Sequence, residues 1–162
     1  MTIRPAQSGD LPEVMRIWNT AIRETNQTFN SQEKTLPEIE ALMAQRAADG
    51  HALLVVEAGV IVGFGTYGQF RGGVGYARSM EHTLYLDAGT RGQGLGRELL
   101  RALEDHARMG GAHSLIGGIA GENEGSIRFH EREGYTRVAT IPEVGFKFGR
   151  YMDLVLLQKI LT

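Results

Sequence analysis

Residues 83–96 are Thr83-Leu84-Tyr85-Leu86-Asp87-Ala88-Gly89-Thr90-Arg91-Gly92-Gln93-Gly94-Leu95-Gly96, and this stretch decides the fold. Its beginning has the apolar and aromatic composition of a buried strand, and leucines at helical spacing follow its end. Glycines at the start of a helix let backbone N–H groups approach an anion, which the positive end of the helix dipole also attracts. The stretch therefore predicts a strand, an anion-binding loop and a helix, rather than a plain turn.

Two other phosphate-binding motifs do not fit this loop. A Walker loop needs a lysine after its last glycine, but Leu95 follows Gly94. A Rossmann fingerprint needs G-x-G-x-x-G near the start of a βαβ unit, whereas this loop has G-x-G-x-G in mid-chain. Both nucleotide-binding classes are therefore disfavoured.

The pattern on both sides of the loop predicts a single α/β (α+β) domain over residues 1–162. We expect a mixed, twisted sheet of about six to seven strands flanked by about four helices. Helix starts are expected near Leu11, Thr35, Leu95 and Asn123, and strands at 52–56, 60–67, 81–86, 114–119, 136–141 and 151–157.

Composition excludes several classes of function. A net charge of −2 provides no basic field for nucleic acid. The absence of cysteine rules out disulfides, a cysteine nucleophile and thiolate metal sites. His51, His106 and His113 have no partner at metal-ligand spacing, so no metal is expected. The polar N-terminus and the lack of a long apolar run predict a cytoplasmic protein that does not bind membranes.

The loop, Arg-x-x-Gly-x-Gly after a strand, resembles the pyrophosphate loop of the GNAT superfamily of N-acetyltransferases. Asn123-x-x-Ser126 and the following 129–135 are similar to that family's second coenzyme segment. The resemblance covers nearly the whole chain and implies acetyl-CoA as co-substrate. The coenzyme-binding residues that it implies are Leu84, Tyr85, Leu86, Arg91, Gly92, Gln93, Gly94, Leu95, Gly96, Arg97, Asn123 and Ser126.

Within that superfamily, the chain most resembles the phosphinothricin and methionine sulfoximine acetyltransferases. The matching segments, which occur in the correct order, are 19–22, 28–29, 63–71, 81–86 and 144–153. The resemblance implies a small, amino-acid-like amine as substrate and a homodimer. Residues 71–77 depart from the pattern, because relatives tend to carry a bulkier stretch there.

Acetyl transfer to an amine requires a base for the amine and a proton or other stabilisation for the leaving thiolate. The resemblance implies that Glu81 activates the amine, directly or through water. Asn123, Ser126 and His130 share one helix face at spacings i, i+3 and i+7. The superfamily commonly has a tyrosine near the thiolate where His130 falls, so we expect His130 to act as the acid. Strand alternation directs His82 to the face opposite Glu81, and no chemistry is assigned to it.

Substrate recognition is expected from basic and aromatic side chains. Arg71 and Arg78 flank the loop before Glu81, and a guanidinium suits a carboxylate or phosphinate. Phe29 and Phe70 are candidate pocket residues, with a core role as the alternative. Lys147 lies between glycines in a hairpin that could close over the site.

Two other functions stay open at this stage. A protein N-terminal or lysine acetyltransferase would need an open peptide groove, and a non-catalytic acyl-CoA-binding module would need no catalytic side chains. The presence of Glu81 and His130 argues against the second alternative. The natural substrate is left open.

Overall fold

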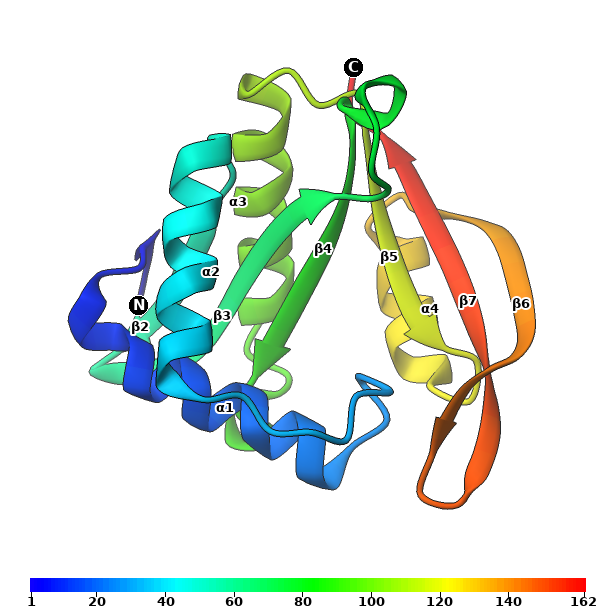
Figure 1. The fold of residues 1–162 in the computed structure, drawn as a ribbon, viewed down its shortest axis with the longest axis horizontal. Coiled ribbons are helices and arrows are strands. Elements are labelled where there is room, and N and C mark those ends of the chain that lie inside the picture. The colour runs from blue at the N-terminus through cyan, green and yellow to red at the C-terminus, as the bar shows by residue number, and fades with distance from the viewer.

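A computed structural model describes residues 1–162 and shows one seven-stranded sheet with helices on both faces (Figure 1). The strand order is β1-β2-β3-β4-β5-β7-β6. The strands are β1 Thr2–Pro5, β2 Leu53–Ala58, β3 Val60–Gln69, β4 Ser79–Leu86, β5 Ser114–Ala120, β6 Thr136–Lys147 and β7 Arg150–Ile160. The helices are α1 Leu11–Glu24, α2 Leu36–Asp49, α3 Leu95–Met109 and α4 Glu124–Arg132. The predicted α/β class is confirmed.

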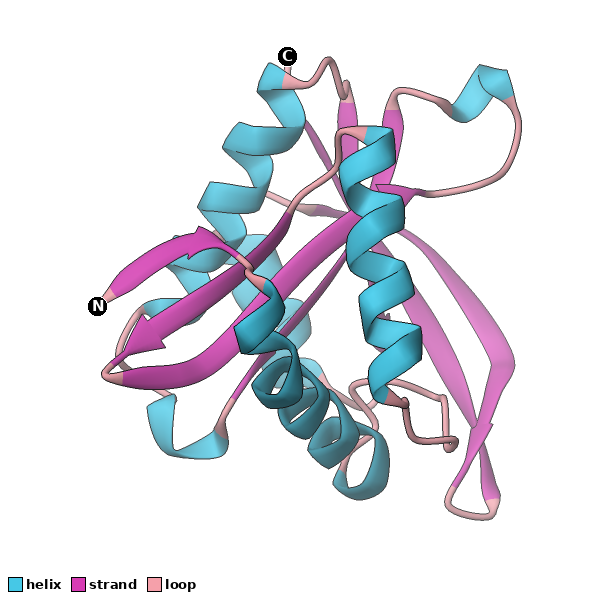
Figure 2. Ribbon diagram, turned by 60° about the vertical axis from the view of Figure 1, so that its left-hand side comes forward, coloured by secondary structure: helices cyan, strands magenta, loops and turns pink.

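Helices α1 and α2 cover one face of the sheet, and α3 and α4 cover the other (Figures 1 and 2). Each face has its own core. Side chains of α1 and α2 pack with Phe64 and Tyr85 on the first face. The predicted apolar stripe of α3, which includes Leu99 and Leu103, is fully buried on the second face together with Ile127 of α4. A side chain of the sheet therefore faces one helix pair or the other.

Local signals set the helix ends. Thr35 and Glu38 form a capping box at the start of α2, and Gly50 ends that helix in the left-handed conformation, with φ 73°. The side chain of Asn123 accepts a hydrogen bond from the Ser126 N–H at the start of α4. These starts agree with the sequence prediction.

Two strands differ from the prediction. The four-residue edge strand β1 was not predicted, because so short a segment carries no clear alternation. Strand β6 continues past Ile141 to Lys147 through an irregularity between Ile141 and Gly145. Within this irregularity Glu143 has φ 53°, and its N–H donates to the Asp153 side chain at 2.9 Å. The kink interrupts the alternation by which a strand is predicted.

Strands β4 and β5 are the feature that positions the site. They form the sheet's one parallel pairing, and it covers only Ser79–Glu81 against Ser114–Ile116. Beyond Glu81 the two strands diverge (Figure 1). Their facing edges therefore present backbone N–H and C=O groups that no neighbouring strand pairs.

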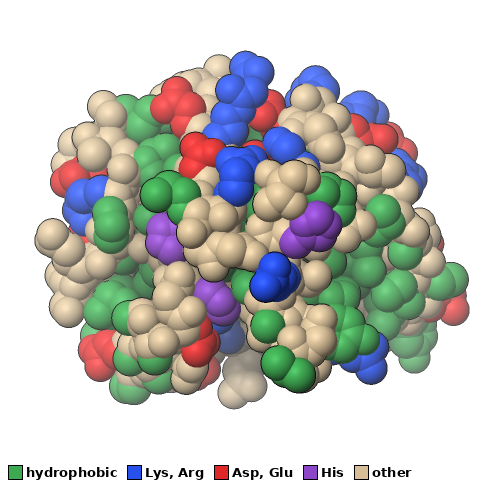
Figure 3. Space-filling view, turned by 90° about the horizontal axis from the view of Figure 1, so that it is seen from above, with side chains coloured by type: hydrophobic (Ala, Val, Ile, Leu, Met, Phe, Trp, Pro, Cys, Tyr) green, Lys and Arg blue, Asp and Glu red, His purple; other side chains and the backbone are tan.

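The surface gives two further observations. None of the helices is both long and apolar enough to cross a membrane. On the end that lies at the top of Figure 1, basic and acidic side chains are intermixed (Figure 3).

Candidate active site

The divergence of β4 and β5 opens a cleft of about 1130 Å³. Its walls come from the α1–α2 loop, β4, the loop before α3, β5 and α4. The structure thus brings together segments that are far apart in the sequence. The predicted site residues that line the cleft are Phe29, Glu81, Leu84, Tyr85, Leu86, Arg91, Gly92, Gly94, Leu95, Gly96, Arg97, Asn123, Ser126 and His130.

The glycine-rich loop has the backbone conformation that its sequence predicts. Gly92 and Gly94 have φ of 79° and 78°, which side-chain-bearing residues rarely adopt. Gly94 is the N-cap of α3, so the unpaired N–H groups of the first turn follow it directly. Gln93 is the exception among the predicted loop residues, because its amide lies 3.4 Å from the Gly89 carbonyl and does not line the cleft. The remaining loop can hold an anion at its backbone.

Glu81 is a carboxylate that no protein group pairs. It is partly buried, forms no ion pair or hydrogen bond, and its pKa is raised by desolvation. Opposite it, a Cβ built on Gly118 would lie 3.2 Å from Glu81 Oε2, so the glycine leaves room for this side chain. A carboxylate with a raised pKa in a cleft is suited to general-base chemistry.

Strand alternation separates Glu81 from its neighbour. Met80 and Leu84 pack in the core beneath α3, whereas Tyr85 packs in the core beneath α1. By the same alternation Glu81 faces the α1 and α2 side, and His82 faces the α3 and α4 side. The predicted separation of Glu81 from His82 is therefore confirmed, although both residues line the cleft.

His82 and His130 form a buried pair that the sequence did not reveal. Their Nε2 atoms lie 3.1 Å apart and their rings are almost coplanar, with an interplanar angle of 3°. His130 Nδ1 lies 2.7 Å from the Ser126 carbonyl oxygen. Burial lowers the pKa of His130 and lowers that of His82 to about 3. Both rings are therefore neutral at neutral pH.

Comparison with known proteins identifies the family. Residues 3–156 match the family model described as an acetyltransferase (GNAT) domain. The chain belongs to the GNAT acetyltransferases. It is 37% identical over 159 residues to an L-methionine sulfoximine/L-methionine sulfone acetyltransferase of Salmonella typhimurium, covering 98% of this chain and 93% of that relative. A phosphinothricin N-acetyltransferase of Streptomyces coelicolor is 35% identical, with coverage of 97% and 94%.

Two solved structures share this GNAT fold closely. A Salmonella typhimurium protein solved with its cofactor acetyl-CoA has a TM-score of 0.97 and 36% identity, covering 100% of this chain and 94% of that one. A ribosomal-protein-alanine N-acetyltransferase from Brucella melitensis has a TM-score of 0.96 and 38% identity, covering 99% of both chains. The predicted resemblance to the superfamily is confirmed.

The α1–α2 loop forms the wall of this acetyltransferase's cleft opposite the coenzyme loop. Lys147 of β6 is buried, and its Nζ donates to the carbonyl oxygens of Thr25 and Thr28 at 2.7 and 2.8 Å. Phe29 packs over Gly145, where a Cβ would lie 2.4 Å from the ring. Lys147 was expected to bind substrate, but it does not line the cleft, because both loop carbonyls engage its ammonium group. It holds the loop instead.

The arginines expected to bind substrate also lie elsewhere. Arg71 and Arg78 are exposed, and the Arg71 guanidinium lies 5.7 Å from the centre of the Tyr76 ring. Neither arginine lines the cleft, nor does Phe70. The physical reason is that the β3–β4 loop lies at the start of β4, whereas the cleft opens at its far end (Figure 1). These expectations fail for the cleft of a single chain.

Sequence reasoning missed several cleft residues. Asn26, Gln27 and Thr28 precede Phe29 in the α1–α2 loop, and Arg132 and Glu133 end α4. The polar run before Phe29 could have signalled the first group, since polar side chains beside an aromatic residue suit a small polar ligand. No local signal marks the second group.

Proposed function

We propose that this GNAT protein transfers the acetyl group of acetyl-CoA to the amine of a small, amino-acid-like molecule. The compounds proposed are methionine sulfoximine, methionine sulfone and phosphinothricin. The observation that carries the proposal is the unpaired Glu81 carboxylate in the same cleft as the glycine-rich loop. The activities for which the two relatives are named support the same reaction.

The cleft fits acetyl-CoA on two counts. The N–H groups of the loop from Gly92 to Gly96 and the start of α3 suit the pyrophosphate. The unpaired edges of β4 and β5 offer hydrogen bonds to an extended amide-containing chain. Bound there, the coenzyme supplies an activated acetyl thioester beside Glu81.

The protein's part in the reaction begins with the amine. Glu81 accepts a proton from the substrate ammonium group, directly or through one water, because burial has raised its pKa. The free amine then attacks the thioester carbon. The chain has no cysteine, and a single direct transfer needs no covalent enzyme intermediate. Phe29 and its loop neighbours enclose the amine side of the cleft.

We also propose that the protein acts in the cytoplasm as a homodimer. The β6–β7 hairpin supports the second part, because Phe146 and Tyr151 pair across it and are 58% and 66% exposed. Such an apolar surface is suited to burial against a second copy across a two-fold axis.

The test is an amine panel in which release of free coenzyme thiol is measured. Methionine sulfoximine, methionine sulfone and phosphinothricin should be acetylated, free methionine less well, and short peptides not at all. A peptide with an N-terminal alanine belongs in the panel, because the Brucella melitensis neighbour is named for that activity. Efficient acetylation of peptides with every amino acid analogue inert would contradict the substrate assignment.

A further inference from the structure

Hydrogen-bond chemistry fixes the protons of the His82–His130 pair. A carbonyl oxygen only accepts, so His130 Nδ1 must carry a proton and donate it to Ser126. A neutral imidazole carries one ring proton, which leaves His130 Nε2 bare. The coplanar contact at 3.1 Å then requires His82 Nε2 to donate to His130 Nε2.

This arrangement leaves one free nitrogen in the pair. His82 Nδ1 is bare, buried and hydrogen-bonded to no protein group. The His82 side chain is 8% exposed, so this nitrogen is desolvated without gaining a partner. His130, by contrast, has both nitrogens occupied and cannot itself reach a reacting atom without breaking a hydrogen bond. The pair is therefore closed at His130 and open at His82.

The open end lies on the coenzyme side of the sheet. His82 faces α3 and α4, and the anion-binding loop leads into α3. Glu81 faces the opposite side, beneath α1 and α2. A Cβ built on Gly117 of β5 would lie 2.9 Å from His82 Nε2 and 3.3 Å from His130 Nε2, so the glycine makes room for the pair. Amine activation and thiolate protonation can thus occur from opposite faces.

We propose that His82 Nδ1 exchanges the proton that passes from the amine nitrogen to the leaving sulfur, and that His130 stores this proton in between. The inference rests on the proposed acetyl transfer. It assigns the contact with the reacting atoms to His82, where the sequence suggested His130.

The proton count of this route balances. As the C–N bond forms, the nitrogen loses a proton to His82 Nδ1, while the His82 Nε2 proton moves to His130 Nε2. When the C–S bond breaks, its electron pair goes to sulfur, and the two protons move back so that His82 Nδ1 protonates the thiolate. The pair ends as it began, and N–H has become S–H.

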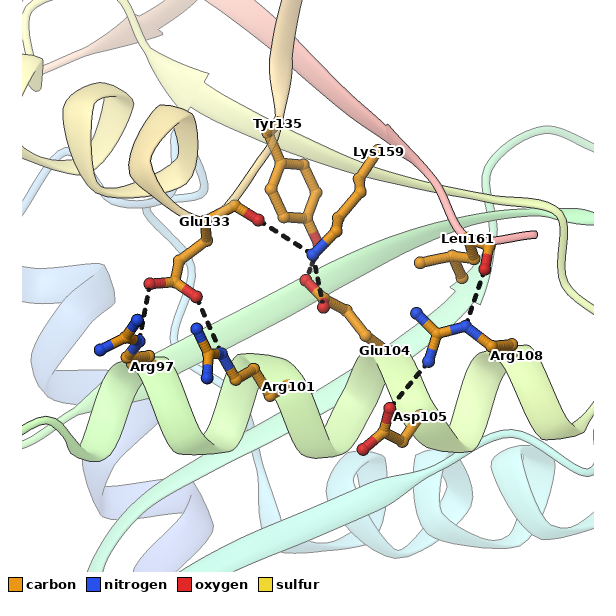
Figure 4. A network of polar contacts seen from close by, with 9 residues as sticks. All are labelled: Arg97, Arg101, Glu104, Asp105, Arg108, Glu133, Tyr135, Lys159 and Leu161. Carbon is orange, nitrogen blue, oxygen red and sulfur yellow. Dashed lines mark hydrogen bonds and ion pairs between the residues drawn. The ribbon is translucent and has the colours of Figure 1, made fainter.

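The surroundings favour storage of the positive charge on His130 rather than on His82. His130 lies in the last turn of α4, where the helix dipole favours a cation, and Glu104 and Glu133 both raise its pKa. These carboxylates belong to a network that fixes them in place (Figure 4). Tyr135 and Lys159 donate to Glu104 at 2.9 Å, and Arg97 and Arg101 pair with Glu133 at 3.1 Å.

The first test reads the tautomers in the free wild-type enzyme, with the histidine ring nitrogens isotopically labelled for NMR at neutral pH. We expect the proton of His130 on Nδ1 and that of His82 on Nε2. A His82 ring protonated on Nδ1, or a His130 ring protonated on Nε2 alone, would overturn the proposal. This measurement needs no substrate, so it is independent of the proposed function.

The second test compares His82→Phe, His130→Phe and the double variant, which keep ring volume and remove the nitrogens. Each single change should lower kcat on the order of 10²-fold. The double variant should be no slower than the slower single variant, because residues that act as a unit are not additive. His113→Phe, at an exposed histidine outside the cleft, is the matched control and should leave kcat unchanged.

Three results would separate the explanations. Near-wild-type kcat in His82→Phe with a slow His130→Phe would show that His130 acts alone. A double variant slowed by the product of the single effects would show that the two histidines act independently, and either result refutes the proposal. Wild-type enzyme that acetylates no amine in the panel would instead refute the proposed function.

Discussion

Glu81 carries the largest effect that a single residue is expected to have. Glu81→Gln keeps the size of the side chain and removes the base, so kcat should fall by about 10²–10⁴-fold with acetyl-CoA binding intact. In the wild type a base must be unprotonated to act, and burial raises the pKa of Glu81. kcat/KM should therefore decline on acidification at a pH above the ordinary carboxyl range. A pH profile of thiol release measures this, and a Glu81→Gln enzyme as fast as wild type would place the base elsewhere.

The same substitution should stabilise the fold, which separates loss of chemistry from loss of structure. A carboxyl group whose pKa is higher in the folded than in the unfolded chain favours folding when protonated and loses that contribution as pH rises through its folded pKa. Glu81→Gln should thus have a higher Tm than wild type at neutral pH, and the difference should disappear in acid. A lower Tm of the variant at neutral pH would contradict this account.

The loop before α3 allows a matched comparison of two glycines. Gly94 and Gly59 both have φ of 78°, and a Cβ on either would meet nothing within 4 Å. Valine at either position is strained by similar amounts, but only Gly94 lines the cleft. Calorimetry should show that Gly94→Val weakens acetyl-CoA binding at least about tenfold, or 1.4 kcal/mol. Gly59→Val should bind normally, and equal affinity of both variants would rule out the loop as the coenzyme site.

Strand β6 should control substrate affinity through the α1–α2 loop. Lys147→Met would leave the carbonyls of Thr25 and Thr28 without their donor, at a cost of about 1–3 kcal/mol for each buried group left unpaired. KM for the amine should rise more than KM for acetyl-CoA, because the loop lines only the amine side. Lys34→Met is the control, since the Lys34 ammonium group contacts the Trp18 ring. Equal changes in both KM values would mean that Lys147 acts on the whole fold.

For the whole molecule, the exposed apolar surface of the β6–β7 hairpin predicts association. The side chains that form it are Val138, Ile141, Val144, Phe146, Phe148 and Tyr151. Analytical ultracentrifugation should give a dimer, and Phe146→Glu should shift it toward monomer because a buried carboxylate would be desolvated without a partner. A monomeric wild type at micromolar concentration would contradict the proposed homodimer.

The sequence by itself determined the elements and the coenzyme half of the site. Helix α3 and its loop could be predicted because their signals are local: glycines at a helix start, and leucines on one helical face. Alternation along β4 likewise assigns Glu81 and His82 to opposite faces of the sheet, because successive side chains of a strand point in opposite directions. Family resemblance supplied the chemical roles that spacing could not.

Only the tertiary structure decided which side chains meet. His82 and His130 are 48 positions apart, and their contact depends on how far β4 and β5 run together before they diverge. Lys147 was expected in the substrate pocket, but the long reach of its side chain allows it to bond a loop 119 positions away. Arg71 was expected there too, yet it lies at the wrong end of β4. Periodicity tells which face a residue occupies, whereas the path of the chain decides what stands opposite it.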